Sequence, residues 1–372
     1  MNKILHNIGI LTLSATLTTG CNNKPAPPQD NKTEFVVYNY PHKKATKLCK
    51  PFDAKAYREK TEAGRMTHDY NSITDSIDKL DAKDGPVVRV FPDTLVQGNT
   101  AIIKVKSLKP LKYPHFEYPE GVNLPLYKIN DSIYTGYMAS TPNIKSGEID
   151  IPVKDLDNNL FKTVKLWIKG KVFENDSIQT TPAVSQLHAT TNENHIIGMA
   201  LRTKSDTAYF GAPPFQIPVK GRYRTEYGQK RVENGILKEN YFHKGMDISA
   251  PEGTPIRPLQ PGKVLVAQMF KLNGGTVIVD HGQGMVSAYL HMSKIDVKEG
   301  QKIGLKDIIG KVGSTGHSTG PHLHFGLYVN GKNVNPMQWL NKEALVYNPK
   351  KPTHSIRHAI KSLAGKVKHS IK

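Results

Sequence analysis

Cysteine is nearly absent from this chain, which has only Cys21 and Cys49 among its 372 residues. An oxidising compartment would permit a disulfide bond. If the Cys21 sulfur is covalently modified, however, Cys49 has no partner for a disulfide within the chain. We therefore predict a fold held together by its apolar core. The length suffices for two or three domains, and the hydrophobic content of 38% is ordinary for globular proteins.

Acidic residues are also scarce, with 32 Asp and Glu against 51 Lys and Arg, a formal net charge of +19. Such a balance favours anionic partners. Outside the cytoplasm these are phosphate-bearing wall polymers, lipid head groups or lipopolysaccharide. Nucleic acid is the competing partner of a basic protein, but no nucleic-acid-binding motif is present, so we expect none. Most of the lysines are interpreted as a solvated surface.

No apolar run near the N-terminus is long enough for a membrane span: residues 4–18 are mostly apolar and follow a short basic segment. This pattern predicts a signal peptide over residues 1–20 and hence export to the cell envelope. The segment that ends in Gly20-Cys21 resembles a bacterial lipobox, which implies a lipidated Cys21 and a membrane-anchored lipoprotein at the periplasmic face or cell surface. The alternative is an ordinary secretory signal that is cut nearby.

Residues 21–84 are expected to form a polar, proline-containing tether and an N-terminal segment. A helix is predicted within this segment, between Asp69 and Leu80. At the other end of the chain, residues 346–372 form a basic tail in which apolar residues recur at spacings of three and four. This tail predicts an amphipathic helix at an anionic surface, with a disordered, solvated tail as the alternative.

Residues 85–180 read as short strands separated by turns. The predicted strands are Val87–Phe91, Ala101–Lys106, Ile133–Met138, Gly147–Ile151 and Val164–Ile168. This spacing suggests a β-sandwich that acts as a spacer or positioning module, because no catalytic cluster of residues is found in it. Residues 181–212 are polar, lack strand periodicity and are interpreted as a linker.

Residues 213–345 form a second all-β domain in our prediction. Helix-length periodic stretches are missing, and segments rich in β-branched residues lie between glycines. The clearest strands are Gly262–Ala267, Gly275–Asp280 and Met285–Leu290. The glycine-rich stretch at residues 313–320 has no Lys at the spacing of a phosphate-binding loop, so we interpret it as a wall of a substrate groove.

Histidines gather in this last domain. If residues 322–325 form a strand, His322 and His324 share one face while Leu323 and Phe325 point into a core. Two such imidazoles are either both metal ligands, or one ligand and one acid/base group. Further candidates are His291 and the pair His243 and Asp247, four residues apart.

The ordered set His-x-x-x-Asp, a lone His and His-x-His resembles the signature of the M23 family of zinc metalloendopeptidases, the lysostaphin-like or LytM-like wall hydrolases. The resemblance covers residues 215–345 and implies antiparallel sheet with an open groove. It assigns Zn²⁺ to His243, Asp247 and His324. It assigns water activation and oxyanion stabilisation to His291 and His322. Secreted members often carry an immunoglobulin-like domain before the catalytic one, and residues 85–180 look like it.

Two nitrogens and one oxygen suit zinc with a fourth position open for water. No Glu stands beside these ligands, so another base is needed, and histidines with pKa values near neutrality are candidates. His281 and His317 are expected on loops without a role in the chemistry. In some latent relatives an upstream asparagine fills the open position, and Asn192 or Asn194 could do so here.

The resemblance implies an endopeptidase that cuts peptide cross-links or stem peptides of peptidoglycan. The alternative is a non-catalytic protein of the same fold that binds the wall or activates an amidase. Such proteins typically lose metal ligands, whereas this chain keeps all five positions, which favours the enzyme. A bond to D-Ala in a diaminopimelate-type stem is the expected target, with a Gly-Gly bridge as the alternative.

Overall fold

The structure is a computed structural model that describes residues 77, 79–211 and 213–340. The predicted signal peptide, Cys21, Cys49, the basic tail and most of the helix expected before Leu80 lie outside these residues. No helix in the described part of the chain is long and apolar enough to cross a membrane.

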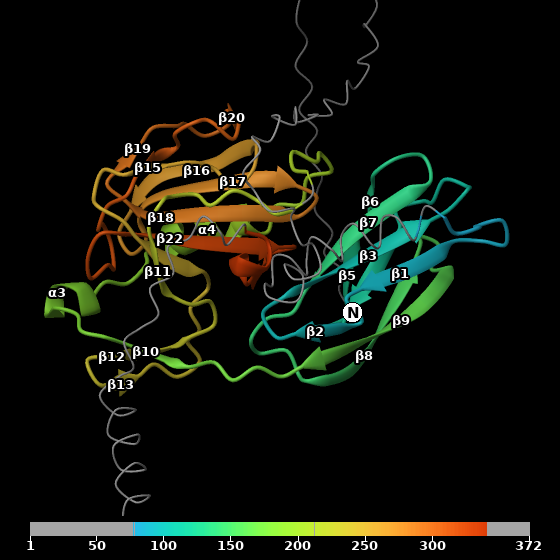
Figure 1. The fold of residues 1–372 in the computed structure, drawn as a ribbon, viewed down its shortest axis with the longest axis horizontal. Helices are drawn as coiled ribbons and strands as arrows, with labels where there is room; N and C mark the ends of the chain where they lie inside the picture. The colour runs from blue at the N-terminus through green and yellow to red at the C-terminus, as the bar shows by residue number, and fades with distance from the viewer. Residues whose placement is uncertain (1–76, 78, 212, 341–372) are drawn as a thin grey trace, which may run out of the picture. The chain divides into compact units, whose positions relative to one another are not determined.

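The first β domain consists of two sheets, coloured blue to green in Figure 1. One has the order β1 (Val87–Phe91), β3 (Thr100–Lys106), β7 (Ile133–Ala139) and β6 (Tyr127–Lys128). The other has the order β2 (Thr94–Val96), β9 (Leu160–Lys169), β8 (Gly147–Lys154), β4 (His115–Tyr118) and β5 (Val122–Pro125).

Alternating apolar residues explain why these two sheets pack face to face. In β9, Val164, Leu166 and Ile168 are buried while their neighbours are exposed. They share one core with residues of the other sheet such as Ile103 and Val105. The predicted β-sandwich is thus confirmed, together with the five strands named above. Its immunoglobulin-like character stays a prediction.

The second domain is built on a large antiparallel sheet, coloured yellow to red in Figure 1. Its strands follow the order β11 (Arg222–Thr225), β14 (Met246–Ser249), β22 (His322–Val329), β18 (Met285–Met292), β17 (Gly274–Gly282), β16 (Gly262–Phe270) and β20 (Lys302–Ile303), and β23 (Lys332–Val334) pairs with β22. The all-β class of this domain is confirmed.

Smaller elements surround the large sheet. One three-stranded sheet contains β15 (Pro255–Ile256), β21 (Gly310–Lys311) and β19 (Lys294–Ile295). Another contains β10 (Asn175–Ile178), β12 (Lys230–Glu233) and β13 (Ile236–Leu237). The helices are α3 (Pro182–Ser185), α4 (Thr191–Leu201) and the 3₁₀ turn η1 (Pro336–Gln338). Strand β10 follows the sandwich in sequence, yet it pairs in parallel with β12.

The large sheet has two distinct faces. One face packs on a core that includes Met246, Tyr289 and Phe325. On the other face, Ile197 and Leu201 of α4 pack against a smaller cluster of buried residues from β16, β17, β18 and β22. Helix α4 therefore lies within the segment interpreted from the sequence as a linker, and it covers part of the sheet.

Candidate metal centre

Three central strands bring the predicted site residues together. Asp247 of β14 pairs directly with His324 of β22, and His324 pairs on its other side with Leu290 of β18. Leu323 and Phe325 enter the main core, so the alternation of side chains places His322 and His324 on the opposite face. The strand predicted at residues 322–325 is confirmed, with both histidines on one face.

His243 reaches the site from the segment that precedes β14. Its backbone is fixed on both sides: its N–H donates to the Gln229 carbonyl at 2.8 Å, and its carbonyl accepts from Gly228 N at 2.8 Å. The ring is 2% exposed. Its Nδ1 lies 2.9 Å from the Glu226 carbonyl, and a carbonyl can only accept, so Nδ1 carries the proton. The lone pair of Nε2 is then directed into the site.

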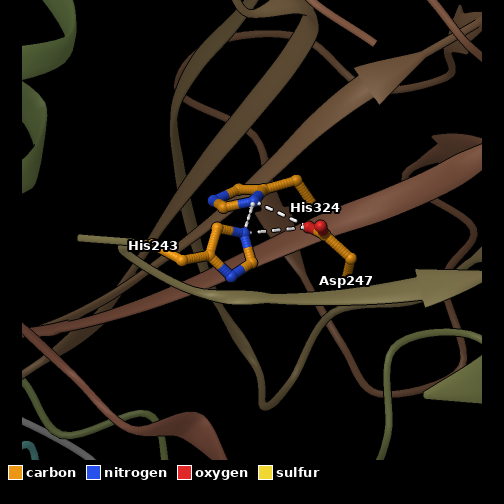
Figure 2. A group of neighbouring side chains, drawn as sticks. All are labelled: His243, Asp247 and His324. Carbon is orange, nitrogen blue, oxygen red and sulfur yellow. Dashed lines mark hydrogen bonds and ion pairs between the residues drawn. The ribbon is translucent and has the colours of Figure 1, made fainter. Parts of the chain in front are cut away.

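Figure 2 shows that His243, Asp247 and His324 point toward one another. His243 Nε2 lies 3.1 Å from Asp247 Oδ1 and 3.0 Å from His324 Nδ1, and the last two atoms are 3.0 Å apart. Two ligands of a tetrahedral ion at about 2.1 Å are separated by about 3.4 Å, close to this spacing. When both imidazoles are neutral and present lone pairs to the site, a cation between the three atoms offsets their mutual repulsion, so this set of ligand atoms fits Zn²⁺.

Charge at the site favours an ionised carboxylate. Burial alone would raise the pKa of Asp247, but the nearby His243 and His324 hold that pKa well below its usual value. Burial lowers the pKa of His324. For His243, burial opposes the charged form, but the Asp247 carboxylate outweighs this and raises the pKa. A divalent cation requires the state with one carboxylate and two neutral imidazoles.

The second pair of predicted residues stands beside the first three. The rings of His291 and His322 lie 4.9 Å apart between centroids, and His291 is 6.1 Å from His324. His322 Nδ1 is 2.8 Å from the Gly320 carbonyl, and His291 Nδ1 is 2.8 Å from the Thr315 carbonyl. Each Nδ1 therefore donates, and each Nε2 is left as a proton acceptor. The Nε2 of His322 is 3.9 Å from Asp247 Oδ1.

His291 occupies a bulge in β18. Val277 pairs with Tyr289 and Gly275 with Met292, so β18 contains one extra residue at this point. The backbone of His291 has a φ of +64°, which is uncommon for a residue other than glycine. The bulge frees the His291 side chain from the main core, which Met292 enters instead.

The expectation that His291 titrates near neutrality is wrong. Burial and the neighbouring His322 and His324 lower its pKa to about 3. The ring is therefore neutral at physiological pH and can accept a proton, but it does not carry one before the reaction. The sequence could not reveal this because the three imidazoles come together only in the fold.

Three further predictions concern polar residues near the site. The prediction that His281 lies on a loop is wrong, because this residue belongs to β17 and is fully buried. His317 does lie outside the strands, and its Nε2 is 3.2 Å from Glu233 Oε1. Asn192 and Asn194 are exposed residues of α4, and no hydrogen bond among the described residues joins them to the five site residues.

Backbone carbonyls that orient the histidines were missed by the sequence reasoning. Glu226, Thr315 and Gly320 each present a carbonyl oxygen to one Nδ1. Because any residue type can present a carbonyl, no sequence pattern could have identified these partners. They fix the tautomers of the rings, as partners behind metal ligands commonly do.

Comparison with known protein families identifies one domain of this chain. The sequence profile of peptidase family M23 matches residues 241–336, a segment that contains all five site residues. The chain therefore contains a peptidase family M23 domain.

Particular relatives follow from the same comparison. The chain is 32% identical over 168 residues to the peptidoglycan DD-endopeptidase ShyA of Vibrio cholerae. The aligned segment covers 45% of this chain and 39% of that protein. It is 41% identical over 102 residues to the DD-carboxypeptidase/endopeptidase Mpg of Neisseria meningitidis, covering 27% of this chain and 24% of that one. The chain thus spans well under half the length of these relatives.

One solved structure is similar over a larger share of the chain. A candidate M23 peptidase from Pseudomonas aeruginosa is 27% identical, with a TM-score of 0.50, and the match covers 66% of this chain and 94% of that one. Since the family profile spans only residues 241–336, this likeness extends beyond the peptidase domain.

Proposed function

We propose that this protein is a zinc-dependent endopeptidase that hydrolyses peptide cross-links or stem peptides of bacterial peptidoglycan. The observation that carries the proposal is the convergence of His243 Nε2, Asp247 Oδ1 and His324 Nδ1 at 3.0–3.1 Å beside two further histidines. Three protein ligands leave a fourth position open, which is the pattern of catalytic zinc sites.

The five site residues have different roles in this proposal. Bound zinc would supply Lewis-acid polarisation of a carbonyl and a water of lowered pKa. His243, Asp247 and His324 would hold the ion. His291, whose Nδ1 donates to the Thr315 carbonyl, would accept a proton at Nε2 as the general base. The proton held by His291 can then pass to the leaving amine, and His322, when protonated at Nε2, would bind the developing oxyanion.

The substrate class rests on the relatives. ShyA is named a peptidoglycan DD-endopeptidase and Mpg a DD-carboxypeptidase/endopeptidase. We propose that this chain likewise cuts a bond to D-Ala in a diaminopimelate-type stem, with a Gly-Gly bridge as the second candidate. Digestion of purified sacculi followed by mass spectrometry of the released fragments distinguishes the two bonds.

Metal analysis and hydrolysis rates of single variants test the proposal. We expect His324→Ala to lose zinc and all activity, because only His243 and Asp247 remain as ligands. We expect His322→Ala and His291→Ala to retain zinc and to lose about 10²–10⁴-fold in rate, the usual contribution of acid–base groups. His188→Ala, an exposed histidine of the linker, is the matched control and should behave as the wild type.

Two outcomes would contradict this reading. Zinc lost from His322→Ala but retained by His324→Ala would overturn the ligand assignment. A zinc-loaded wild type that binds sacculi without cutting any bond would favour the alternative, a wall-binding or amidase-activating protein.

We also propose that the protein acts in the cell envelope as a lipoprotein anchored through Cys21, with the basic tail at an anionic surface. The lipobox-like segment before Cys21 and the net charge of +19 support this. Cys21→Ser should release the protein from the membrane fraction while detergent extracts keep full hydrolytic activity. Membrane retention of that variant would exclude the lipid anchor.

A further inference from the structure

Glu193 is a buried carboxylate that touches the turn between β16 and β17. It is 1% exposed and lies in the first turn of α4. Its Oε1 accepts hydrogen bonds from Asn273 N at 3.0 Å and from Asn273 Nδ2 at 2.6 Å. Both carboxylate oxygens lie 3.3 Å from Leu272 N. One side chain from the helix therefore satisfies three N–H donors of Leu272 and Asn273 in this three-residue turn.

The same turn holds two segments of the metal centre through its carbonyls. Asn273 O accepts the backbone N–H of His291 at 3.1 Å, and Leu272 O accepts that of His317 at 2.8 Å. Thr315, whose carbonyl accepts from His291 Nδ1, also binds Gly275 N through its Oγ1 at 2.9 Å. Both the backbone and the ring of His291 are thus tied to this turn.

His291 needs such support more than its neighbours do. Its φ of +64° lies in the left-handed region, and a residue with a Cβ stays there only when its surroundings hold it. The regular ladder cannot do so, because the bulge interrupts the pairing of β18 with β17 at this residue. The hydrogen bond to Asn273 O is what replaces the missing ladder bond.

We propose that Glu193 is a positioning residue for His291, so that α4, which lies outside residues 241–336, completes the active site. The inference rests on the proposed function, in which His291 is the general base. Glu193 itself touches neither the metal ligands nor His322. It acts by fixing the orientation of the two peptide units whose carbonyls hold the catalytic segments.

Kinetics on the zinc-loaded full chain test this role. We expect Glu193→Ala to keep its zinc and to keep KM within about twofold, while kcat falls about 10²-fold, the cost of displacing a catalytic group by about 1 Å. Glu193→Gln keeps one acceptor oxygen for Asn273 and should recover most of kcat. Ile197→Ala weakens the packing of the same helix without touching the turn, so it should keep its kcat.

A double-mutant cycle separates positioning from general damage. If Glu193 acts through His291, Glu193→Ala should cause no further loss of activity in the His291→Ala background. An equal fold-loss in both backgrounds, or an unchanged kcat in Glu193→Ala, would overturn the proposal.

A readout that does not need activity keeps the two proposals distinct. Amide hydrogen exchange of His291, followed by NMR in the zinc-loaded protein, should accelerate at least tenfold in Glu193→Ala and stay unchanged in Ile197→Ala. If this holds while the wild type cuts no peptidoglycan, the proposed function fails and the coupling between Glu193 and His291 stands. Unchanged exchange of His291 would remove the coupling whatever the activity is.

Discussion

At the scale of single residues, His281 illustrates how burial fixes a charge state outside the metal centre. Its Nδ1 lies 2.8 Å from the Pro261 carbonyl, and its Nε2 lies 2.7 Å from Ser287 Oγ, which is 2.8 Å from the Tyr289 hydroxyl oxygen. The side chain is fully buried, and this burial lowers its pKa from 6.5 to about 4. The folded protein therefore keeps this imidazole neutral, whereas the unfolded chain protonates it below pH 6.5.

This difference predicts a pH dependence of stability. Because the unfolded state binds one more proton between pH 6.5 and 4, the stabilisation is complete above pH 6.5 and falls as the pH drops toward 4. The shift corresponds to a loss of about 3 kcal/mol by pH 4. His281→Gln cannot titrate, so its free energy of unfolding should fall less steeply over this range.

Urea unfolding of both proteins in a zinc chelator measures this difference, since carboxylates and the other histidines contribute equally to each. Parallel slopes for the two proteins between pH 6.5 and 4.5 would show that His281 is not held neutral by the fold.

The identities of the site residues could be predicted from the sequence, but their chemistry could not. The resemblance of these residues to the M23 signature implied a cluster, and the fold does bring His243, Asp247 and His324 together. The pKa of His291 depends on two imidazoles that are 31 and 33 residues away in the sequence. The tautomers depend on backbone carbonyls, which leave no sequence signal.

At the scale of elements, the approach of β14 to β22 sets the spacing of the candidate metal ligands. Gly245 lies directly before β14, and a Cβ there would overlap the Phe325 carbonyl and lie 2.9 Å from His324 Nε2. Backbone cannot move away as the end of a flexible side chain can. The absence of a side chain at this position therefore lets the His243–Asp247 segment sit against His324.

We predict that Gly245→Ala weakens zinc binding about 10–100-fold, as displacement of a ligand's support typically does. The reason is that β14 must separate from β22, which widens the gap between Asp247 and His324. Competition with a chromophoric chelator measures the affinity. Gly304→Ala is the control, since a Cβ there meets only Asp307 Oδ2 at 3.9 Å; equal zinc affinity of the two variants would contradict the prediction.

Elements with strict alternation were predictable, whereas those defined by tertiary contacts were not. Strand β9 alternates buried and exposed residues and was found. Helix α4 was missed, although Thr190 followed three residues later by Glu193 is a helix-start signal, and Thr190 Oγ1 does accept from Glu193 N at 3.0 Å. Strand β10 has no alternation of apolar residues, and only its pairing with β12 makes it a strand.

At the scale of the whole described molecule, the sandwich and the peptidase domain share apolar contacts and buried hydrogen bonds. The side chains of Ile102 and Tyr137 belong to sandwich strands but pack in the core of the large sheet. There the Tyr137 ring lies 5.9 Å from the Trp339 ring between centroids. Gln338 accepts from Thr100 N at 2.7 Å and donates to Thr100 O at 2.9 Å. Separating the domains would exchange these hydrogen bonds for bonds to water, at a net cost of about 0.5–1.5 kcal/mol for each, and would expose the shared apolar surface.

We therefore predict that the two domains unfold in one cooperative transition. The two tryptophans allow a direct test, because Trp167 is exposed on the sandwich and Trp339 is buried in the peptidase core. In a Trp167→Phe background, tryptophan fluorescence reports the surroundings of Trp339 alone. Phe116→Ala removes a fully buried ring from the sandwich core and should cost about 3–5 kcal/mol.

If the domains are coupled, Phe116→Ala should lower the urea midpoint of Trp339 fluorescence, and that midpoint should coincide with the midpoint from circular dichroism. Independent domains would instead give a biphasic dichroism curve and an unmoved Trp339 transition. The expected coincidence follows from the position of β3 and β7, whose alternate residues serve the two cores: Ile103 and Met138 face the sandwich, while Ile102 and Tyr137 face the peptidase domain. Neither strand can unfold without opening both cores. A substitution that destabilises one core must therefore lower the stability of the other domain as well.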